Sequence, residues 1–381
     1  MTTTGHPPPR ILFLSNESPH SAAAGAIVLQ RLFQSYPADR MLVVTNNPPP
    51  ASAARLSCRY AELSLAVDRL NRTRFSHWRP ALRVLGGASL ISLARVDSAL
   101  EGFVPDLVAT VMQDSWYYDL AARYANHRKI PLVLFIHDYP QGFEPVWPWL
   151  RDRQAARDVA VYRQAARRLC VSPGMAAHFQ HEFGLSGDVL LPPRSDTTPR
   201  QSPEQCAQLR QPGRLTLGYA GGLHYGYGKQ LLQMLPVLRA TGTMVELFGP
   251  APSGMLASLR DATDVLRFNG YVSPPEAAWG ELLKRCDVVL QPYLNPAGKH
   301  ELQYRTHFPS KLGDCLSLGL PLLITGPADA SGVKWCLQHP GCAHVVTEPG
   351  AAALDAALRR LAADSSHRVA LARQAQAVAG G

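Results

Sequence analysis

The sequence predicts two α/β domains in series, each built on a parallel β-sheet. Short apolar runs alternate with segments of helical spacing from residue 11 onward, and the same alternation restarts at residue 214. The two halves are separated by a segment rich in proline and small polar residues that has no sustained apolar period. Such alternation is typical of a parallel sheet with helices on its faces. We therefore expect domains over residues 1–193 and 214–362, a linker over 194–213, and a C-terminal helix over 363–381 that returns toward the first domain.

Apolar runs between turn residues predict the strands of the first half. They lie at 11–15, 41–45, 107–112, 131–136 and 169–171. Ligands of open parallel sheets bind beyond the carboxyl ends of the strands, so the loop that ends at Gly25 and the pair His137-Asp138 lie on the predicted binding edge. His137 could act on a hydroxyl group or hold one by a hydrogen bond. Its position fits a structural histidine equally well, and Gly25 fits an ordinary flexible loop.

Two further segments of the first half are candidate binding surfaces. The loop 142–149 carries two tryptophans and two prolines. It is a plausible wall or lid for an acceptor, with Trp147 as the candidate contact. The segment Arg55–Arg95 holds eight arginines against two acidic residues, with Phe75 and Trp78 among them. Such a surface could dock on anionic lipid, or it could be a solvated pair of helices.

The second half repeats the pattern and adds a glycine-rich turn. Strands are predicted at 214–219, 244–248, 265–268, 287–291 and 322–325, and helices at 231–238 and 275–285. The turn 220–229, AGGLHYGYGK, follows a strand and precedes a helix. Its four glycines, Gly221 and Gly222 among them, allow a ligand to approach the backbone closely, and Lys229 could reach a phosphate. The G-K-[ST] of a P-loop is absent.

The stretch Tyr304–Gly326 carries the most specific chemistry. Ser310 is placed to cap a helix over 311–318, and Gly319 and Pro321 end that helix before a short strand. Free N–H groups at the start of such a helix, together with the cation of Lys311, would suit a phosphate. The carboxylate of Asp314 could accept two sugar hydroxyls. The alternative is an ordinary capped helix with a solvated lysine.

Composition limits the classes of function. With 381 residues, 46% hydrophobic and 18% charged residues, the chain is long enough for two globular domains and contains no apolar run of membrane-spanning length. The first ten residues do not resemble a signal peptide, and seven cysteines without a C-x-x-C pair suggest a reduced, cytoplasmic protein. The thirteen histidines form no zinc motif, so we expect no metal. The net charge of +9 would suit binding to nucleic acid, to an anionic membrane or to a phosphorylated substrate, but no nucleic-acid-binding motif is present.

Together these segments resemble the GT-B glycosyltransferases of family 4 (glycosyltransferase group 1). The resemblance implies two Rossmann-like domains that face each other across a cleft, and it covers almost the whole chain. It implies a nucleotide-diphosphate sugar as co-substrate, no other cofactor, and a glycan or lipid-linked acceptor. The residues that carry it are the turn at Gly221-Gly222 and the segments 245–249, 266–273, 282–293 and 308–321.

The resemblance also assigns roles to single residues. Asp314 matches the family's ribose-binding glutamate, whereas Thr306 occupies the place of the glutamate that contacts the donor sugar. An arginine usual after the glycine turn is missing, so Lys229 and Lys311 would carry the diphosphate charge. His137 matches the family's histidine near the reacting sugar, which makes His137 and Lys311 the candidate catalytic residues.

The implied reaction is the transfer of a hexose-like group in polysaccharide or glycolipid assembly. Negative charge grows on the leaving phosphate, so fixed cations and N–H dipoles there lower the barrier. The sequence contains no Asp-x-Asp metal motif, which agrees with a metal-independent mechanism, and the family is mostly retaining. A nucleotide-sugar 2-epimerase is one alternative, although Thr306 removes a carboxylate that epimerases need. A non-catalytic relative that binds a sugar nucleotide is the other.

Overall fold

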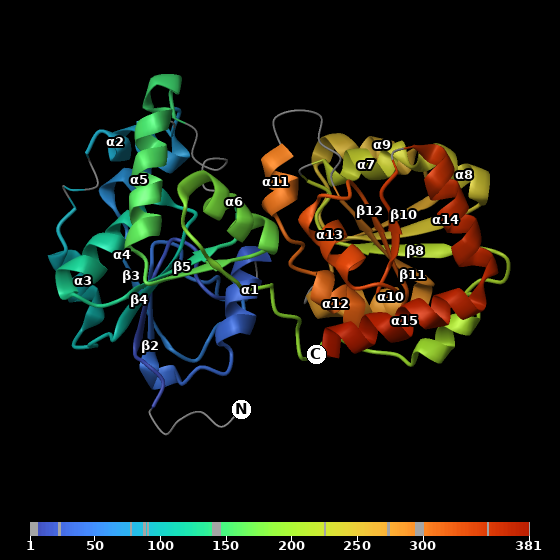
Figure 1. Ribbon diagram of the computed structural model, residues 1–381, viewed down its shortest axis with the longest axis horizontal. Coiled ribbons are helices and arrows are strands. Elements are labelled where there is room, and N and C mark those ends of the chain that lie inside the picture. The colour runs from blue at the N-terminus through green and yellow to red at the C-terminus, as the bar shows by residue number, and fades with distance from the viewer. Residues whose placement is uncertain are drawn as a thin grey trace. The chain divides into compact units, whose positions relative to one another are not determined.

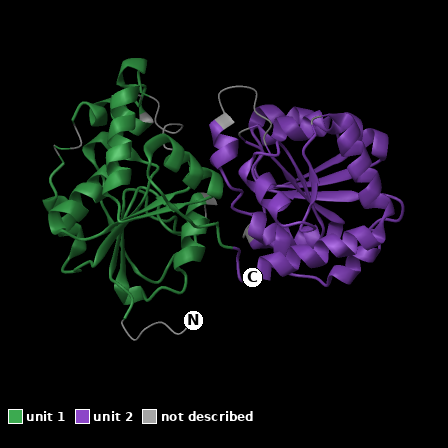
Figure 2. Ribbon diagram, in the orientation of Figure 1, with its two compact units in different colours: residues 1–193 green, residues 194–381 purple. Residues whose placement is uncertain are grey.

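The computed structural model describes residues 7–21, 24–76, 78–86, 89, 91–138, 146–224, 226–272, 275–293, 301–348 and 350–380. The chain divides into two compact units, Met1–Pro193 and Arg194–Gly381 (Figure 2). The division falls after Pro193, where the first predicted domain ends. Each unit is a separate α/β domain with its own parallel sheet.

Unit 1 contains a seven-stranded parallel sheet in the order β3-β2-β1-β4-β5-β6-β7 (Figure 1). Its strands are β1 (Ile11–Leu14), β2 (Met41–Thr45), β3 (Arg59–Glu62), β4 (Leu107–Val111), β5 (Leu132–Ile136), β6 (Arg167–Cys170) and β7 (Asp188–Val189). Its helices are α1 (Ala24–Phe33), α2 (Trp78–Val84), α3 (Ala94–Leu100), α4 (Ser115–Arg128), α5 (Arg151–Gln164) and α6 (Pro173–Phe183). Short 3-10 turns are η1 (Ala38–Arg40), η2 (Ala66–Arg72) and η5 (Pro148–Leu150).

The elements of unit 1 follow from apolar strands and well-capped helices. The central strands β1 and β2 are buried along their whole length, as expected for strands covered on both faces. The Asp114 side chain accepts a hydrogen bond from the Trp116 N–H at 3.1 Å and so begins α4. Ser172 does the same for α6, with Pro173 at the first helical position.

Unit 2 contains a six-stranded parallel sheet in the order β10-β9-β8-β11-β12-β13. Its strands are β8 (Thr216–Ala220), β9 (Met244–Phe248), β10 (Leu266–Gly270), β11 (Val288–Pro292), β12 (Leu322–Thr325) and β13 (His344–Val346). Its helices are α7 (Tyr227–Gln233), α8 (Leu235–Thr241), α9 (Leu256–Arg260), α10 (Pro275–Arg285), α11 (Glu301–Thr306), α12 (Leu312–Ser317), α13 (Ser331–Gln338), α14 (Ala351–Ala363) and α15 (Ser365–Gly380). The 3-10 turns are η6 (Pro203–Ala207) and η7 (Ser253–Met255).

The sheet of unit 2 is covered on both faces. Helices α7, α8, α9 and α14 lie on one face, and α10, α12 and α15 lie on the other (Figure 1). Chain connections run away from β8 toward β9 on one side and from β11 toward β12 on the other. The strand order therefore switches between β8 and β11, and the carboxyl ends of these two strands are where this type of sheet binds ligands.

Some elements differ from those predicted. The strand β3 was not predicted because its sequence, RYAE, is polar and mostly exposed at the sheet edge. The helix predicted at 231–238 is two helices, α7 and α8, because Pro236 begins a second helix at its first turn. Ser310 does not cap α12. The residue at the cap position is Lys311, in helical backbone geometry and without a side-chain capping bond.

The predicted linker and C-terminal helix are both integrated into unit 2. Arg368 of α15 is buried, and its guanidinium donates to the carbonyl oxygens of Cys206 at 2.9 Å and Ala207 at 3.0 Å. It also donates to the carbonyl of Leu361 at 2.7 Å. In the structure α15 packs on α12 and η6 of its own unit. The return of this helix toward the first domain stays a prediction.

The arginine-rich segment is not a uniformly solvated basic surface. Arg79 and Arg83 of α2 are buried, and each is paired with two carboxylates. Other arginines of the segment, such as Arg69 and Arg74, are exposed. In the part of the chain that the structure describes, no helix combines the length and apolarity needed to cross a membrane.

Candidate functional site

The carboxyl end of β8 forms the centre of the candidate site in unit 2. Directly after the strand, Gly221 has a φ of +155°, which L side chains rarely adopt. A Cβ atom at Gly221 would lie 2.2 Å from the Nζ of Lys311. The backbone conformation therefore favours glycine at position 221, and a side chain there would also displace the lysine from its present position.

Lys311 brings a partly buried cation to this turn. Its Nζ donates a hydrogen bond to the carbonyl oxygen of Ala220 at 2.7 Å and lies 3.9 Å from the ring centroid of Tyr219. Burial lowers the pKa of Lys311 to about 8, so the ammonium remains charged in most molecules at neutral pH. A carbonyl dipole and an aromatic face satisfy only part of a buried ammonium, which leaves it able to pair with an anion.

A further hydrogen bond within unit 2 holds the glycine turn. The Tyr219 hydroxyl donates to the carbonyl oxygen of Gly222 at 3.0 Å. Lys229 lies in α7 with an exposed side chain, and Ser310 is partly exposed next to Lys311. The structure thus joins Lys311 directly to Gly221, whereas contact of Lys229 or Ser310 with a donor stays a prediction.

Asp314 holds the start of unit 2 in place. Its carboxylate is buried, and Oδ1 accepts hydrogen bonds from the Ser195 N–H at 2.8 Å and from the Thr198 hydroxyl at 2.7 Å. In this conformation the carboxylate anchors residues 195–198 against α12. Binding of ribose hydroxyls by Asp314 stays a prediction, and it would require a carboxylate oxygen to become accessible.

The residue at the position of the missing glutamate has a structural role. Thr306 is buried at the end of α11, where its hydroxyl donates to the carbonyl oxygen of Leu302 at 2.7 Å. This bond lies within the helix. The side chain of Glu301, which the sequence suggested as a substitute, lies outside the described residues.

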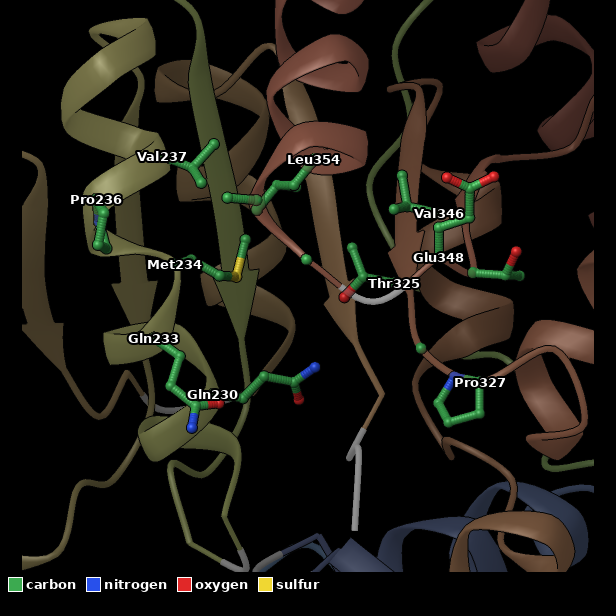
Figure 3. Close-up of a pocket in the computed structure, with 14 residues that line it drawn as sticks. Gln230, Gln233, Met234, Pro236, Val237, Thr325, Pro327, Val346, Glu348 and Leu354 are labelled. Carbon is green, nitrogen blue, oxygen red and sulfur yellow. The ribbon is translucent and has the colours of Figure 1, made fainter. Parts of the chain in front are cut away.

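A cavity of about 400 Å³ opens at the ends of β12 and β13 (Figure 3). Its apolar side is formed by Met234, Val237 and Leu354, and Glu348 stands at its polar side. The Oε1 atom of Gln230 lines this cavity without a hydrogen-bond partner in the described structure. Sequence reasoning missed this cavity because its lining comes from several elements that each carry ordinary core residues.

In unit 1, a second group of predicted residues meets at the carboxyl ends of β1, β4 and β5. His137 and Asp138 directly follow β5. Burial lowers the pKa of His137, with a small opposing effect of Asp138, so the imidazole is neutral at pH 7. A neutral imidazole can accept a proton or hold a hydroxyl group.

Glu17 joins this group and was not singled out from the sequence. Burial, and next the negative charge of Asp138, raises the pKa of Glu17, while hydrogen bonds to the Ala26 backbone and the Gln113 side chain lower it. A Cβ atom at Gly25 would lie 2.6 Å from Glu17 Oε1, so the glycine makes room for the carboxyl group. The available signal was a lone acidic residue in the binding-edge loop after β1.

A polar cavity of about 760 Å³ lies at the ends of β1, β2 and β3, and Asn16, which precedes Glu17 in the chain, contributes to its lining. Four asparagines contribute to its lining, together with Glu62, Asp68, Arg69 and Arg95. The Oδ1 atom of Asn46 is buried without a hydrogen-bond partner among the described atoms. Amides and charges of both signs suit the hydroxyl groups of a carbohydrate.

Trp147 does not lie in that cavity. Its ring meets Trp78 edge to face, with centroids 4.9 Å apart, and stacks on Trp149 at 6.1 Å. Residues 142–145 of the predicted lid loop 142–149 lie outside the described residues. A contact of Trp147 with an acceptor stays a prediction. Within the described ranges, no three His, Cys, Asp or Glu side chains are placed to hold a metal ion.

Comparisons with known proteins support the two-domain reading. The family model described as Glycosyltransferase Family 4 matches residues 42–191. No curated protein matches the sequence. Among solved structures, HepE of Anabaena in complex with UDP and glucose is similar with a TM-score of 0.63 and 16% identity over 98% of this chain and 95% of that chain.

Two other solved structures show the same arrangement of elements. WaaG, a glycosyltransferase involved in lipopolysaccharide biosynthesis, has a TM-score of 0.61 and 15% identity over 97% of this chain and 95% of its own. Sucrose-phosphate synthase from Thermosynechococcus elongatus has a TM-score of 0.65 and 13% identity over 97% of this chain and 94% of its own. These similarities confirm the predicted GT-B fold with its two Rossmann-like domains.

Proposed function

We propose that this chain, which has the GT-B fold and resembles Glycosyltransferase Family 4 over residues 42–191, transfers a sugar from a nucleotide-diphosphate sugar to a hydroxyl acceptor. HepE was solved with UDP and with UDP-glucose, and WaaG is a glycosyltransferase of lipopolysaccharide assembly. A UDP-sugar donor and a role in polysaccharide or glycolipid synthesis are therefore the first specific forms of this proposal.

The observation that carries the proposal is the contact between Lys311 and the glycine turn. The partly buried ammonium of Lys311 lies against Gly221, at the end of the strand beside the switch in strand order. A diphosphate at this turn would meet a full positive charge and a backbone without side chains. Transfer breaks the bond between the sugar C1 and the phosphate oxygen, so the leaving diphosphate gains negative charge that Lys311 would stabilise.

We assign the acceptor to the polar cavity of unit 1 and to the group beside it. His137 and Glu17 are the candidates to orient the acceptor hydroxyl and receive its proton as the new bond to C1 forms. The raised pKa of Glu17 makes its carboxylate a better proton acceptor than an exposed glutamate would be. Transfer without a metal ion and with retention of configuration belongs to the same proposal.

The proposal can be tested by a donor screen with a matched pair of variants. The full chain is incubated with nucleotide-sugars and glycan or lipid-linked acceptors, and free nucleotide and glycosylated product are measured by mass spectrometry. Lys311→Ala should weaken nucleoside-diphosphate binding by about tenfold to a hundredfold, because a buried charge pair is lost. Binding of the nucleoside should change little. Lys334→Ala, which removes an exposed lysine of α13, should leave both affinities unchanged.

The outcomes separate the three candidate functions. Turnover only in the presence of an acceptor supports sugar transfer. Conversion of the donor into its 2-epimer supports the epimerase, and binding without any turnover supports the non-catalytic relative. Equal losses of nucleotide and nucleoside binding in Lys311→Ala would contradict a phosphate role for this lysine.

A further inference from the structure

Helix α2 of unit 1 exposes two large apolar residues and buries two arginines. Trp78 and Leu82, spaced by one helical turn, are 44% and 38% exposed, and Leu85 directly after the helix is 53% exposed. Arg79 and Arg83 are 3% and 0% exposed, and Pro80, Ala81 and Val84 of the same helix are buried as well. Buried arginines beside exposed tryptophan and leucine are unusual for a surface helix, which normally turns its charged residues to solvent.

The inner side of α2 is held by ion pairs. Arg83 is bound to Asp119 of α4 at 2.7 Å and to Asp158 of α5 at 2.8 Å. Arg79 is bound to Asp114 at 2.8 Å and to Asp68 at 3.0 Å. These four carboxylates fix the rotation of the helix, so the exposure of its apolar side is imposed by the fold.

The exposed apolar side of α2 continues into neighbouring aromatic residues. Trp78 meets Trp147, and Trp147 stacks on Trp149, which is 63% exposed. Phe75, 45% exposed, lies one turn before Trp78, whose N–H donates to the Phe75 carbonyl oxygen at 2.9 Å. We call Phe75, Trp78, Leu82, Leu85 and Trp149 the α2 patch.

Exposed cations accompany the α2 patch. The Arg74 guanidinium lies 4.9 Å from the centroid of the Phe75 ring. Arg151 and Arg153 begin α5, two and four residues after Trp149, and both are exposed. Asp152 is the acidic residue between them. Tryptophan and leucine beside arginine is the composition of protein surfaces that insert shallowly into the headgroup region of anionic membranes.

We propose that the α2 patch docks this protein on an anionic lipid surface. Phe75, Trp78, Leu82, Leu85 and Trp149 would enter the boundary between headgroups and acyl chains, while Arg74, Arg151 and Arg153 contact the phosphates. The arginine-rich segment suggested lipid binding through its charge. In the structure two of those arginines are buried, so we assign the main contribution to membrane binding to the exposed apolar residues of α2. This proposal is independent of sugar transfer.

The test is co-sedimentation of the full chain with vesicles of phosphatidylcholine, with and without about 30% phosphatidylglycerol. We expect binding to the anionic vesicles and a blue shift of tryptophan emission. Leu82→Glu combined with Leu85→Glu should lower the partition coefficient at least about tenfold, because two side chains that would insert into the lipid become charged. Leu337→Glu alters a 47% exposed leucine of α13 and should bind like the parent.

The salt dependence of binding separates the apolar contribution from the electrostatic one. Arg74→Gln combined with Arg151→Gln should reduce binding at low ionic strength and remove most of its dependence on salt. All variants change exposed residues, so thermal unfolding should match the parent. The proposal is overturned if the parent fails to bind anionic vesicles, or if Leu82→Glu/Leu85→Glu binds as well as Leu337→Glu. A parent that dimerises through the patch and ignores vesicles would likewise overturn it.

Discussion

At the scale of single residues, Lys311 combines two requirements that oppose each other. Its side chain is partly buried, and this desolvation lowers its pKa to about 8, yet a phosphate-binding group must carry charge. The hydrogen bond to Ala220 and the ring of Tyr219 compensate part of the desolvation. A bound diphosphate would supply the remaining counter-charge and raise the pKa again.

This leads to a prediction about pH. Above pH 8 the free protein loses the Lys311 proton, so binding of a nucleoside diphosphate must take up a proton, and affinity should fall by up to about tenfold per pH unit. Isothermal titration calorimetry between pH 7 and 9.5 in buffers of different ionisation enthalpy measures both the affinity and the proton uptake. The nucleoside alone should show neither effect.

The stability of the unliganded protein should change in the opposite direction. The folded pKa of Lys311 lies below its ordinary value of 10.5, so the unfolded chain binds more protons between pH 8 and 10.5. The contribution of Lys311 to the free energy of unfolding therefore rises with pH in that window. Lys311→Met should lack both pH dependences. A parent and a Lys311→Met variant with the same affinity profile would refute the assignment.

Residues with a local signal were predictable, and residues defined by distant contacts were not. Gly221 and Lys311 stand in motifs that can be read along the chain. The anchoring of Asp314 to Ser195 joins residues 119 positions apart, and nothing near either residue indicates it. The environment of Glu17 depends on Asp138 and Gln113 from two other loops, so its raised pKa could not be inferred before the sheet was known.

At the scale of elements, apolar strands were predictable and ion-paired helices were not. The strands β2, β9 and β12 agree with the predicted residues because each is a buried apolar run. Helix α2 has no such run, and Arg79 and Arg83 in its sequence predict a solvent-exposed helix face. Its orientation depends on carboxylates of α4 and α5, whose positions are set by tertiary structure.

The ion pairs of α2 give a prediction about stability. Arg83→Met would leave Asp119 and Asp158 without their buried counter-charge and should lower the free energy of unfolding by about 3–5 kcal/mol. Arg128→Met is the matched control, since its partner Asp97 is 41% exposed and the guanidinium is 48% exposed. The control should cost far less, because exposed ion pairs contribute little to stability. Urea unfolding followed by circular dichroism measures both.

A rescue variant distinguishes lost pairing from lost packing. Adding Asp119→Asn and Asp158→Asn to Arg83→Met removes the uncompensated charges and should recover part of the stability. Burial already raises the pKa of Asp158, so the Arg83→Met variant should also become less destabilised at acidic pH. A cost for Arg83→Met as small as that for Arg128→Met would show that the ion pairs do not hold α2.

At the scale of the whole molecule, the proposed donor contacts all belong to one unit. The turn at Gly221, Lys311 and Asp314 lie within residues 194–381, and so do the hydrogen bonds that position them. The segment predicted as a free linker begins this unit, and α15 ends it. Arg368 joins the two through its bonds to Cys206 and Ala207. This closure indicates that residues 194–381 form a domain able to fold alone.

We therefore expect the fragment 194–381 to fold and to bind a nucleoside diphosphate within about tenfold of the affinity of the full chain, because the binding groups and their supports are retained. The fragment should show no sugar transfer, since His137 and Glu17 are absent. A shorter fragment, 194–364, lacks α15 and the buried Arg368, and it should fail to give a cooperative unfolding transition. Circular dichroism of the two fragments measures their folding, and calorimetry measures their unfolding and their binding of the nucleoside diphosphate. A folded 194–381 fragment that binds no nucleotide would place the donor contacts elsewhere, and a fully stable 194–364 fragment would show that α15 is not part of the domain.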